Sequence, residues 1–245
     1  MAIDTKAIEY RDGDSDLTGL LAWDNSHDGK RPGILLVHGG AGLDDHAKGR
    51  ARLLARSGFV VFACDMYGDG VAGNRQRVLA QISELRRDPE TMSRRGRSGL
   101  AVLASQTLVD GRFAAVGYCF GGLVVLELAR SGFELAGVVS VHGSLDTSQR
   151  AQPKSVKAKI LVCHGALDPH VPMGQVTAFA EEMNHAGADW QLIIYGGALH
   201  GFTHDRGPQL PGVQYHLQTD IRSSDAMQNF FAELFRDNRK CLPID

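Results

Sequence analysis

Cys119 lies in a segment whose residue types favour nucleophilic chemistry. Residues 117–122 read Gly-Tyr-Cys-Phe-Gly-Gly and join an apolar, strand-like run at 112–117 to a helical pattern over 121–130. Such a junction is typical of a nucleophile elbow, in which glycines let the strand and the helix pack closely around a strained residue. The N-terminus of the helix favours a thiolate over a thiol, whose ordinary pKa is about 8.5. We therefore predict that Cys119 is a nucleophile; the alternative is a buried structural cysteine.

A thiol nucleophile needs a base, and the base needs a group that orients it. His200 follows a strand-like run in a glycine-rich loop, and Asp168 follows an earlier run. Both therefore lie where the strands of an open α/β sheet end and bind ligands. The chain order Cys119, Asp168, His200 is the nucleophile, acid, histidine order that accompanies such elbows. An aspartate before proline is by itself more often a turn former. The rival histidines at predicted strand ends are His142, His164, His170 and His204.

A second glycine-rich turn follows an earlier strand-like run. Residues 38–42 read His-Gly-Gly-Ala-Gly, which is similar to the loop that supplies an oxyanion hole in esterases. Acyl transfer needs backbone N–H groups that face the developing negative charge. The predicted donors are the backbone amides of Gly40 and Phe120.

Runs rich in β-branched residues alternate with helical patterns, which is typical of a mostly parallel sheet with helices on both faces. The predicted strands are 7–10, 17–22, 33–37, 59–63, 112–117, 135–141, 158–163 and 190–195. The predicted helices are 44–57, 121–130, 173–185 and 224–236. The first two strands form a hairpin on an antiparallel edge. Together with the elbow, this pattern predicts an α/β-hydrolase fold.

The chain is predicted to be a single domain over residues 1–245. Its pattern loosens around 66–110, an insertion in which we expect one or two helices. Seven arginines gather there: Arg75, Arg77, Arg86, Arg87, Arg94, Arg95 and Arg97. Such a run is most often a solvated helix face, although an insertion of this kind can also cover a site.

The composition, with 43% hydrophobic and 22% charged residues, is that of a globular protein. A net charge of −2 does not favour nucleic acid as a partner. Residues 1–10 lack a signal-peptide core and no run is long enough to span a membrane, so we expect a cytoplasmic protein. Cys64, Cys163 and Cys241 do not pair at metal-ligand spacing with each other or with Cys119. We expect reduced thiols, no metal or other cofactor, and a monomer or small homo-oligomer.

The sequence resembles the dienelactone hydrolase family over nearly its whole length. The resemblance rests on Gly-Tyr-Cys-Phe-Gly-Gly at 117–122, Cys-Asp-Met-Tyr at 64–67, the segment 165–172 around Asp168, and Leu-His-Gly-Phe at 199–202. It implies an α/β-hydrolase fold and a Cys, Asp and His triad that falls on Cys119, Asp168 and His200.

Two positions depart from what the resemblance implies. Archetypal members carry a glutamate beside the cysteine, where this chain has Gly39, and an arginine after the catalytic histidine, where it has His204. Arg75 or Arg77 is a candidate to replace that arginine in binding a substrate carboxylate. His204 and Phe202 are further candidates for contact with the substrate.

We therefore predict a hydrolase that cleaves a small ester or lactone through a thioester on Cys119. One alternative is a general carboxylesterase or thioesterase whose substrate is unrelated to dienelactones. The other is a protein that uses the same fold for binding or thiol redox sensing, with Cys119 oxidised instead of acylated.

Overall fold

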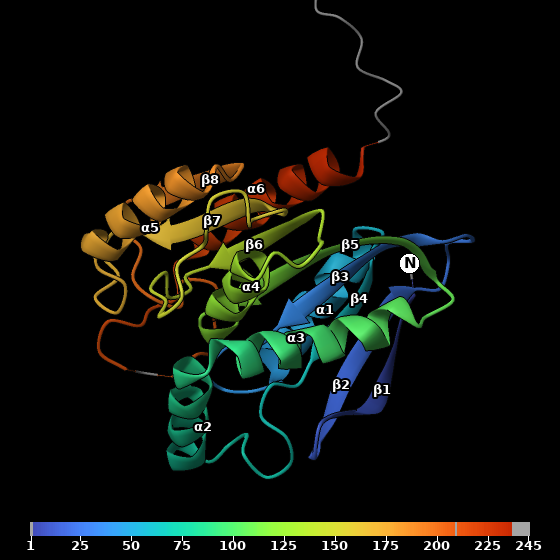
Figure 1. Cartoon of the computed structure of the whole chain (residues 1–245). Coiled ribbons are helices and arrows are strands. Elements are labelled where there is room, and N and C mark those ends of the chain that lie inside the picture. The colour runs from blue at the N-terminus through green and yellow to red at the C-terminus, as the bar shows by residue number, and fades with distance from the viewer. Residues whose placement is uncertain (1, 209, 237–245) are drawn as a thin grey trace, which may run out of the picture.

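Eight strands form one sheet across the molecule in the computed structural model, which describes residues 2–208 and 210–236 (Figure 1). The order across the sheet is β1-β2-β4-β3-β5-β6-β7-β8. The strands are β1 (Ile3–Asp12), β2 (Ser15–Asp24), β3 (Arg31–Val37), β4 (Val60–Cys64), β5 (Val109–Tyr118), β6 (Gly137–Val141), β7 (Lys159–Gly165) and β8 (Trp190–Tyr195). All eight predicted strands are present.

Only the edge formed by β1 and β2 runs antiparallel. β1 pairs with β2 as a hairpin and β2 pairs antiparallel with β4, while every other neighbouring pair is parallel. The chain passes from β3 outward to β4 and then returns to β5 on the other side of β3. The direction of winding therefore reverses between β3 and β5, and open α/β sheets bind ligands at the carboxyl ends of the strands at such a point. The predicted α/β-hydrolase fold is confirmed.

Helices cover both faces of the sheet and bury it in two apolar layers. One layer holds side chains from α2, α3, α4 and α5, and the opposite layer holds side chains from α1 and α6. The helices are α1 (Asp45–Arg56), α2 (Arg75–Arg87), α3 (Pro89–Ala104), α4 (Phe120–Arg130), α5 (Met173–Ala186) and α6 (Leu217–Phe235). None of the described helices is long and apolar enough to cross a membrane.

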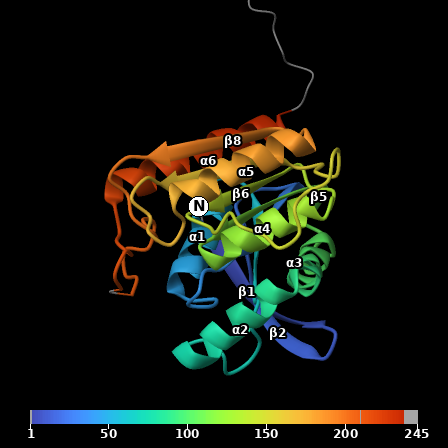
Figure 2. The same cartoon turned by 60° about the vertical axis from the view of Figure 1, so that its left-hand side comes forward.

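The arginine-rich segment forms two helices that differ in their surroundings. α3 packs against α4 and the sheet, whereas α2 lies at the periphery in both views (Figures 1 and 2). Arg95 on α3 is buried and donates to Asp12, to the Met66 carbonyl and to Ser15. Arg95 is therefore an exception to the predicted solvated face, because it anchors α3 to the hairpin edge. The prediction is confirmed for the exposed arginines of the run, which are Arg75, Arg77, Arg86, Arg87 and Arg94.

The backbone segments on both sides of Cys119 lie so close together that only glycine fits at positions 117 and 121. A Cβ atom on Gly117 would lie 1.9 Å from the Gly121 carbonyl oxygen, and one on Gly121 would lie 2.2 Å from the Val37 carbonyl oxygen. The first residues of α4 thus pass directly over the ends of β5 and β3. This packing fixes Cys119 at the carboxyl end of β5, beside the end of β3.

Replacing Gly117 by alanine is expected to lower the free energy of unfolding by about 3 kcal/mol or more, because the added methyl group has no space. Gly49 is a matched control, since it lies within α1 and a Cβ there meets nothing within 4 Å. Gly49→Ala should raise stability by about 0.5–1 kcal/mol. Urea unfolding of both variants checks this, and a Gly117→Ala protein as stable as the parent would contradict the packing argument.

Candidate active site

Cys119 has the strained backbone expected of an elbow. Its φ of 53° and ψ of −114° are unusual for a residue with a side chain, and it lies between β5 and the first residue of α4. Its N–H points to the Val141 carbonyl oxygen at 3.0 Å and to His142 Nδ1 at 3.2 Å. These contacts hold the turn in this conformation.

His200 brings its ring between the sulfur and a carboxylate. Its Nε2 lies 3.1 Å from Cys119 Sγ and its Nδ1 lies 2.8 Å from Asp168 Oδ2. The backbone of His200 is held on both sides, because its N–H donates to the Gly212 carbonyl and its carbonyl accepts from Gln214 N–H. The structure therefore brings together the three residues that the sequence singled out.

Asp168 serves as a turn former and as a partner of His200 at once. Its Oδ1 accepts from the backbone amides of His170 at 2.8 Å and Val171 at 3.1 Å, which leaves Oδ2 for the imidazole. The side chain is buried. The carboxylate is thus held in one orientation, and it can fix which ring nitrogen of His200 faces the sulfur.

The charges of the three groups support one another. Burial alone would lower the pKa of His200, but the hydrogen bonds to Asp168 and Cys119 outweigh it and raise this pKa to about 10. Burial opposes ionisation of Cys119, yet the hydrogen bond and charge of His200 lower the pKa of the thiol. The arrangement favours a thiolate beside an imidazolium at neutral pH.

Two backbone amides interact with the sulfur in addition to His200. Hydrogen bonds from Gly40 and Phe120 also help to lower the pKa of the Cys119 thiol. Gly39 lies against the elbow, since a Cβ there would be 3.4 Å from both Cys119 Cβ and the Tyr118 carbonyl oxygen. The absence of a side chain at Gly39 leaves this flank of the cysteine open.

His142 lies behind the elbow as a neutral ring. Its Nδ1 accepts from Cys119 N–H, so the proton lies on Nε2 and is donated to Thr203 Oγ1 at 2.8 Å. Burial, followed by the charge of His200, holds the pKa of His142 well below its usual value. Its position after β6 made it a rival base, but both of its nitrogens are occupied.

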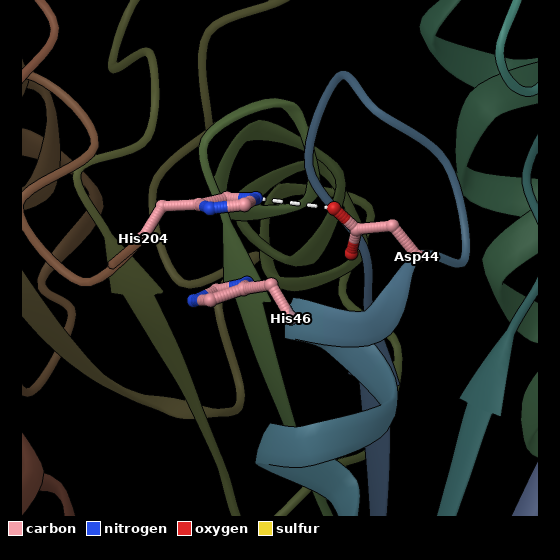
Figure 3. Close-up of side chains that lie close together, drawn as sticks. All are labelled: Asp44, His46 and His204. Carbon is pink, nitrogen blue, oxygen red and sulfur yellow. Dashed lines mark hydrogen bonds and ion pairs between the residues drawn. The ribbon is translucent and has the colours of Figure 1, made fainter. Parts of the chain in front are cut away.

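His204 is held away from the sulfur by its own partners. Its Nε2 lies 3.1 Å from Asp44 Oδ2, and its ring stacks on that of His46 with centroids 4.3 Å apart (Figure 3). The prediction that His204 contacts the substrate therefore receives no support from this arrangement. Sequence reasoning missed the partnership because Asp44 and His204 are far apart along the chain.

Asp44, His46 and His204 also raise the question of a metal site, since one ligand atom from each lies within 4.8 Å of the others. A metal ion bonds an imidazole nitrogen close to the plane of the ring. The two rings are only 11° from parallel, so no point between them lies in both planes. Arg50 adds a positive charge 3.3 Å from His46 Nε2. The cluster in this arrangement does not fit a metal ion.

The prediction that Phe202 contacts the substrate is wrong. Its ring is fully buried in the layer beneath α6 and packs edge-on against His142 and Tyr195. It cannot contact a substrate there, and its part is to support the His142 ring.

The two arginines proposed for carboxylate binding separate in space. Arg77 donates to the Gly70 carbonyl oxygen at 3.1 Å, beside the loop that precedes α2. Arg75 is exposed and shares a face of α2 with Ile82, seven residues further on. Ile82 reaches over the oxyanion loop, because a Cβ on Gly40 would lie 3.7 Å from its Cδ1. Arg75 therefore lies on the helical face that borders the site.

The pH dependence of alkylation tests the ionisation of Cys119. Since its pKa is lowered, reaction with iodoacetamide should be half-maximal below pH 8.5, the value of an ordinary thiol. Asp168→Asn weakens the imidazolium and should move the midpoint upward. Mass spectrometry of the peptide that contains Cys119 separates it from the other cysteines. A midpoint at or above that of a free thiol would contradict the ion pair.

Two solved structures and one curated protein are similar to this chain in sequence. The solved structure named m3DLH is 36% identical and superposes with a TM-score of 0.90, covering 96% of this chain and 100% of that one. The same identity and TM-score hold for a dienelactone hydrolase-like promiscuous phosphotriesterase, P91, from metagenomic libraries, with 96% and 99% covered. An uncharacterized protein of Caenorhabditis elegans is 35% identical over 143 residues, which are 56% of this chain and 90% of that protein.

The profile described as "Dienelactone hydrolase family" matches residues 17–235. This range contains the elbow, the oxyanion loop, Asp168 and His200. The resemblance noted from the motifs is thereby confirmed over most of the sequence. The chain belongs to the dienelactone hydrolase family.

Proposed function

We propose that this protein hydrolyses a small ester or lactone through a thioester on Cys119, with His200 and Asp168 completing a triad. Membership of the family makes the chain a carboxylic-ester hydrolase. The observation that carries the finer assignment is the continuous line of short contacts from Cys119 Sγ through both ring nitrogens of His200 to Asp168.

The mechanism follows from these contacts. The thiolate of Cys119 attacks the carbonyl carbon, and the new oxyanion accepts hydrogen bonds from the Gly40 and Phe120 amides. The imidazolium of His200 donates its proton to the leaving alkoxide, and a thioester remains. Neutral His200 then takes a proton from water, which attacks the thioester and releases the acid. Asp168 stabilises the imidazolium in both halves without accepting its proton. No step requires a metal or another cofactor.

The surroundings of the sulfur favour an apolar substrate without a required charge. Ile82 of α2 covers one side of the oxyanion loop, and Leu167, which directly precedes Asp168, is 59% exposed. Leu79, on the same face of α2 as Ile82, is 56% exposed. Exposed leucines on the two segments that carry Asp168 and Ile82 are suited to bind a short acyl or alkyl chain. We therefore propose short-chain esters and lactones as the substrate class, with a carboxylate as an additional group that Arg75 can bind.

Cys119→Ala should lower ester hydrolysis by roughly 10⁴-fold or more, since the nucleophile and its charge are both lost. Cys163→Ala is the matched control, because Cys163 is buried and burial raises the pKa of its thiol to about 12. Initial rates with p-nitrophenyl acetate and butyrate measure both variants. Appreciable residual hydrolysis by Cys119→Ala would remove the assigned nucleophile. A stable oxidised Cys119 after peroxide, without any ester turnover, would instead support the redox alternative.

Charge reversal on α2 tests whether an arginine binds a substrate carboxylate. Arg75→Glu should lower kcat/KM for a carboxylate-bearing lactone more than for a neutral ester, because Arg75 lies on the face that borders the site. Arg77→Glu, the control on the other side of the helix, should change both substrates little. Equal losses for anionic and neutral substrates would show that Arg75 does not recognise a carboxylate.

A second candidate activity is hydrolysis of phosphotriesters. The P91 structure, 36% identical, is named as a promiscuous phosphotriesterase, and Gly39 leaves the flank of Cys119 open. The phosphorus of a triester already carries four groups when the thiolate attacks, whereas a carbonyl carbon carries three, so space beside the sulfur is useful. Paraoxon should release p-nitrophenol at a measurable rate that depends on Cys119. Gly39→Glu should reduce this rate more than that of p-nitrophenyl acetate, and an equal reduction would speak against the role of the open flank.

A further inference from the structure

His38 is a buried histidine that the proposed mechanism leaves without a part. It follows β3 directly, and its side chain is 0% exposed. Its backbone carbonyl lies beneath the elbow, since a Cβ on Gly121 would be 2.7 Å from it. A buried imidazole at the base of the oxyanion loop calls for an account of both of its nitrogens.

The neighbours of His38 settle which nitrogen carries the proton. The backbone N–H of Met66 points at Nε2 with a distance of 3.0 Å. A backbone N–H can only donate, so Nε2 is the acceptor and the proton of the neutral ring lies on Nδ1. Nδ1 is 2.7 Å from the carbonyl oxygen of Gly39. His38 therefore donates a short hydrogen bond to the peptide that joins Gly39 to Gly40.

The orientation of that peptide decides where the oxyanion hole points. In a trans peptide the C=O and N–H groups lie on opposite sides. Holding the Gly39 carbonyl toward His38 therefore turns the Gly40 N–H the other way, toward Cys119, whose thiolate this amide stabilises. The Gly42 N–H, at 3.2 Å, is a second donor to the same carbonyl. Tyr67 Oη lies 3.3 Å from the next carbonyl, that of Gly40.

We infer that His38 is a positioning residue that aims the Gly40 amide into the oxyanion hole through the Gly39 carbonyl. The inference rests on the proposed function, since it assigns a role in the same acyl transfer. It differs from acid–base catalysis, because His38 neither reaches the sulfur nor moves a proton. A pair of glycines has little conformational preference of its own. The Nδ1 donor at 2.7 Å is the shortest of the contacts that hold the Gly39 carbonyl, which also lies 3.2 Å from Gly42 N and 3.5 Å from Tyr67 Oη.

Two variants separate the donor from the acceptor of this ring. The amide nitrogen of asparagine can take the place of Nδ1, so His38→Asn keeps a donor for the Gly39 carbonyl. The amide oxygen of glutamine can take the place of Nε2, so His38→Gln keeps an acceptor for Met66 N–H without the donor. Thermal unfolding midpoints confirm that each variant is folded.

Three measurements distinguish a role of His38 in orienting the Gly40 amide from a role in the stability of the fold. Iodoacetamide alkylation of Cys119 displaces iodide and forms no oxyanion, so it reports the thiolate alone. Addition of butanal to the thiol forms a hemithioacetal whose oxygen lies in the hole, and its affinity is measured as protection of Cys119 from iodoacetamide. Hydrolysis of p-nitrophenyl acetate supplies kcat and KM.

His38→Gln should weaken butanal binding and lower kcat by about 10-fold to 10²-fold, approaching the effect of losing one oxyanion donor. Its alkylation rate should stay within about twofold of the parent and its KM should change little. His38→Asn should retain both kcat and butanal affinity within about threefold. This difference between the two variants is expected if the hydrogen bond from Nδ1 matters, and it is not expected if only the packing of the side chain matters.

Parallel losses of alkylation, butanal affinity and hydrolysis in His38→Gln would overturn the inference in favour of a merely structural role. If His38→Gln does not fold, a folded His38→Asn that loses butanal affinity overturns it as well. Butanal protection needs no ester turnover. A parent protein that binds butanal but hydrolyses no ester therefore contradicts the proposed function while the role of His38 is still measured.

Discussion

The hydrogen bond between Cys119 Sγ and His200 Nε2 is the interaction on which the account of this site depends. At 3.1 Å it lets a thiolate and an imidazolium stabilise each other, while Asp168 holds the second ring nitrogen at 2.8 Å. Each member alone would be costly, because a buried charge without a partner is strongly disfavoured. In the proposed mechanism they provide a nucleophile that is ionised before substrate binds and an acid that is protonated for the leaving group.

The fold keeps this hydrogen bond in place mainly by fixing the backbone at the residues that form it. Gly117 and Gly121 allow α4 to cross β5 and β3 at contact distance, which fixes the sulfur. The Asp168 turn and the pairing of His200 with residues 212–214 fix the carboxylate and the ring. The proposed oxyanion loop, residues 38–42, is held in the same way, because His38 and Tyr67 contact the carbonyls of two of its glycines. Preorganisation of this kind aims donors before the charge develops.

The sequence predicted what depends on local pattern. Apolar runs located every strand, and glycine-rich loops at strand ends located Cys119, Asp168 and His200, because parallel strands bring their carboxyl ends to one edge. It did not predict contacts of side chains outside these motifs: Phe202 turns inward against His142, His204 pairs with Asp44, and Arg95 pairs with Asp12. α6 also begins at Leu217 rather than near 224, because the His216 side chain caps it through Thr219 N–H. Loop sequences leave side-chain direction open until tertiary partners select it.

Rapid acid quenching of the protein during turnover of a slowly hydrolysed ester, followed by peptide mass spectrometry, tests the central claim most directly. The account predicts an acyl group on the peptide that contains Cys119, formed within the time of one turnover and lost as product appears. Product release with the acyl group on another residue, or with no acylated peptide at any time, would contradict it.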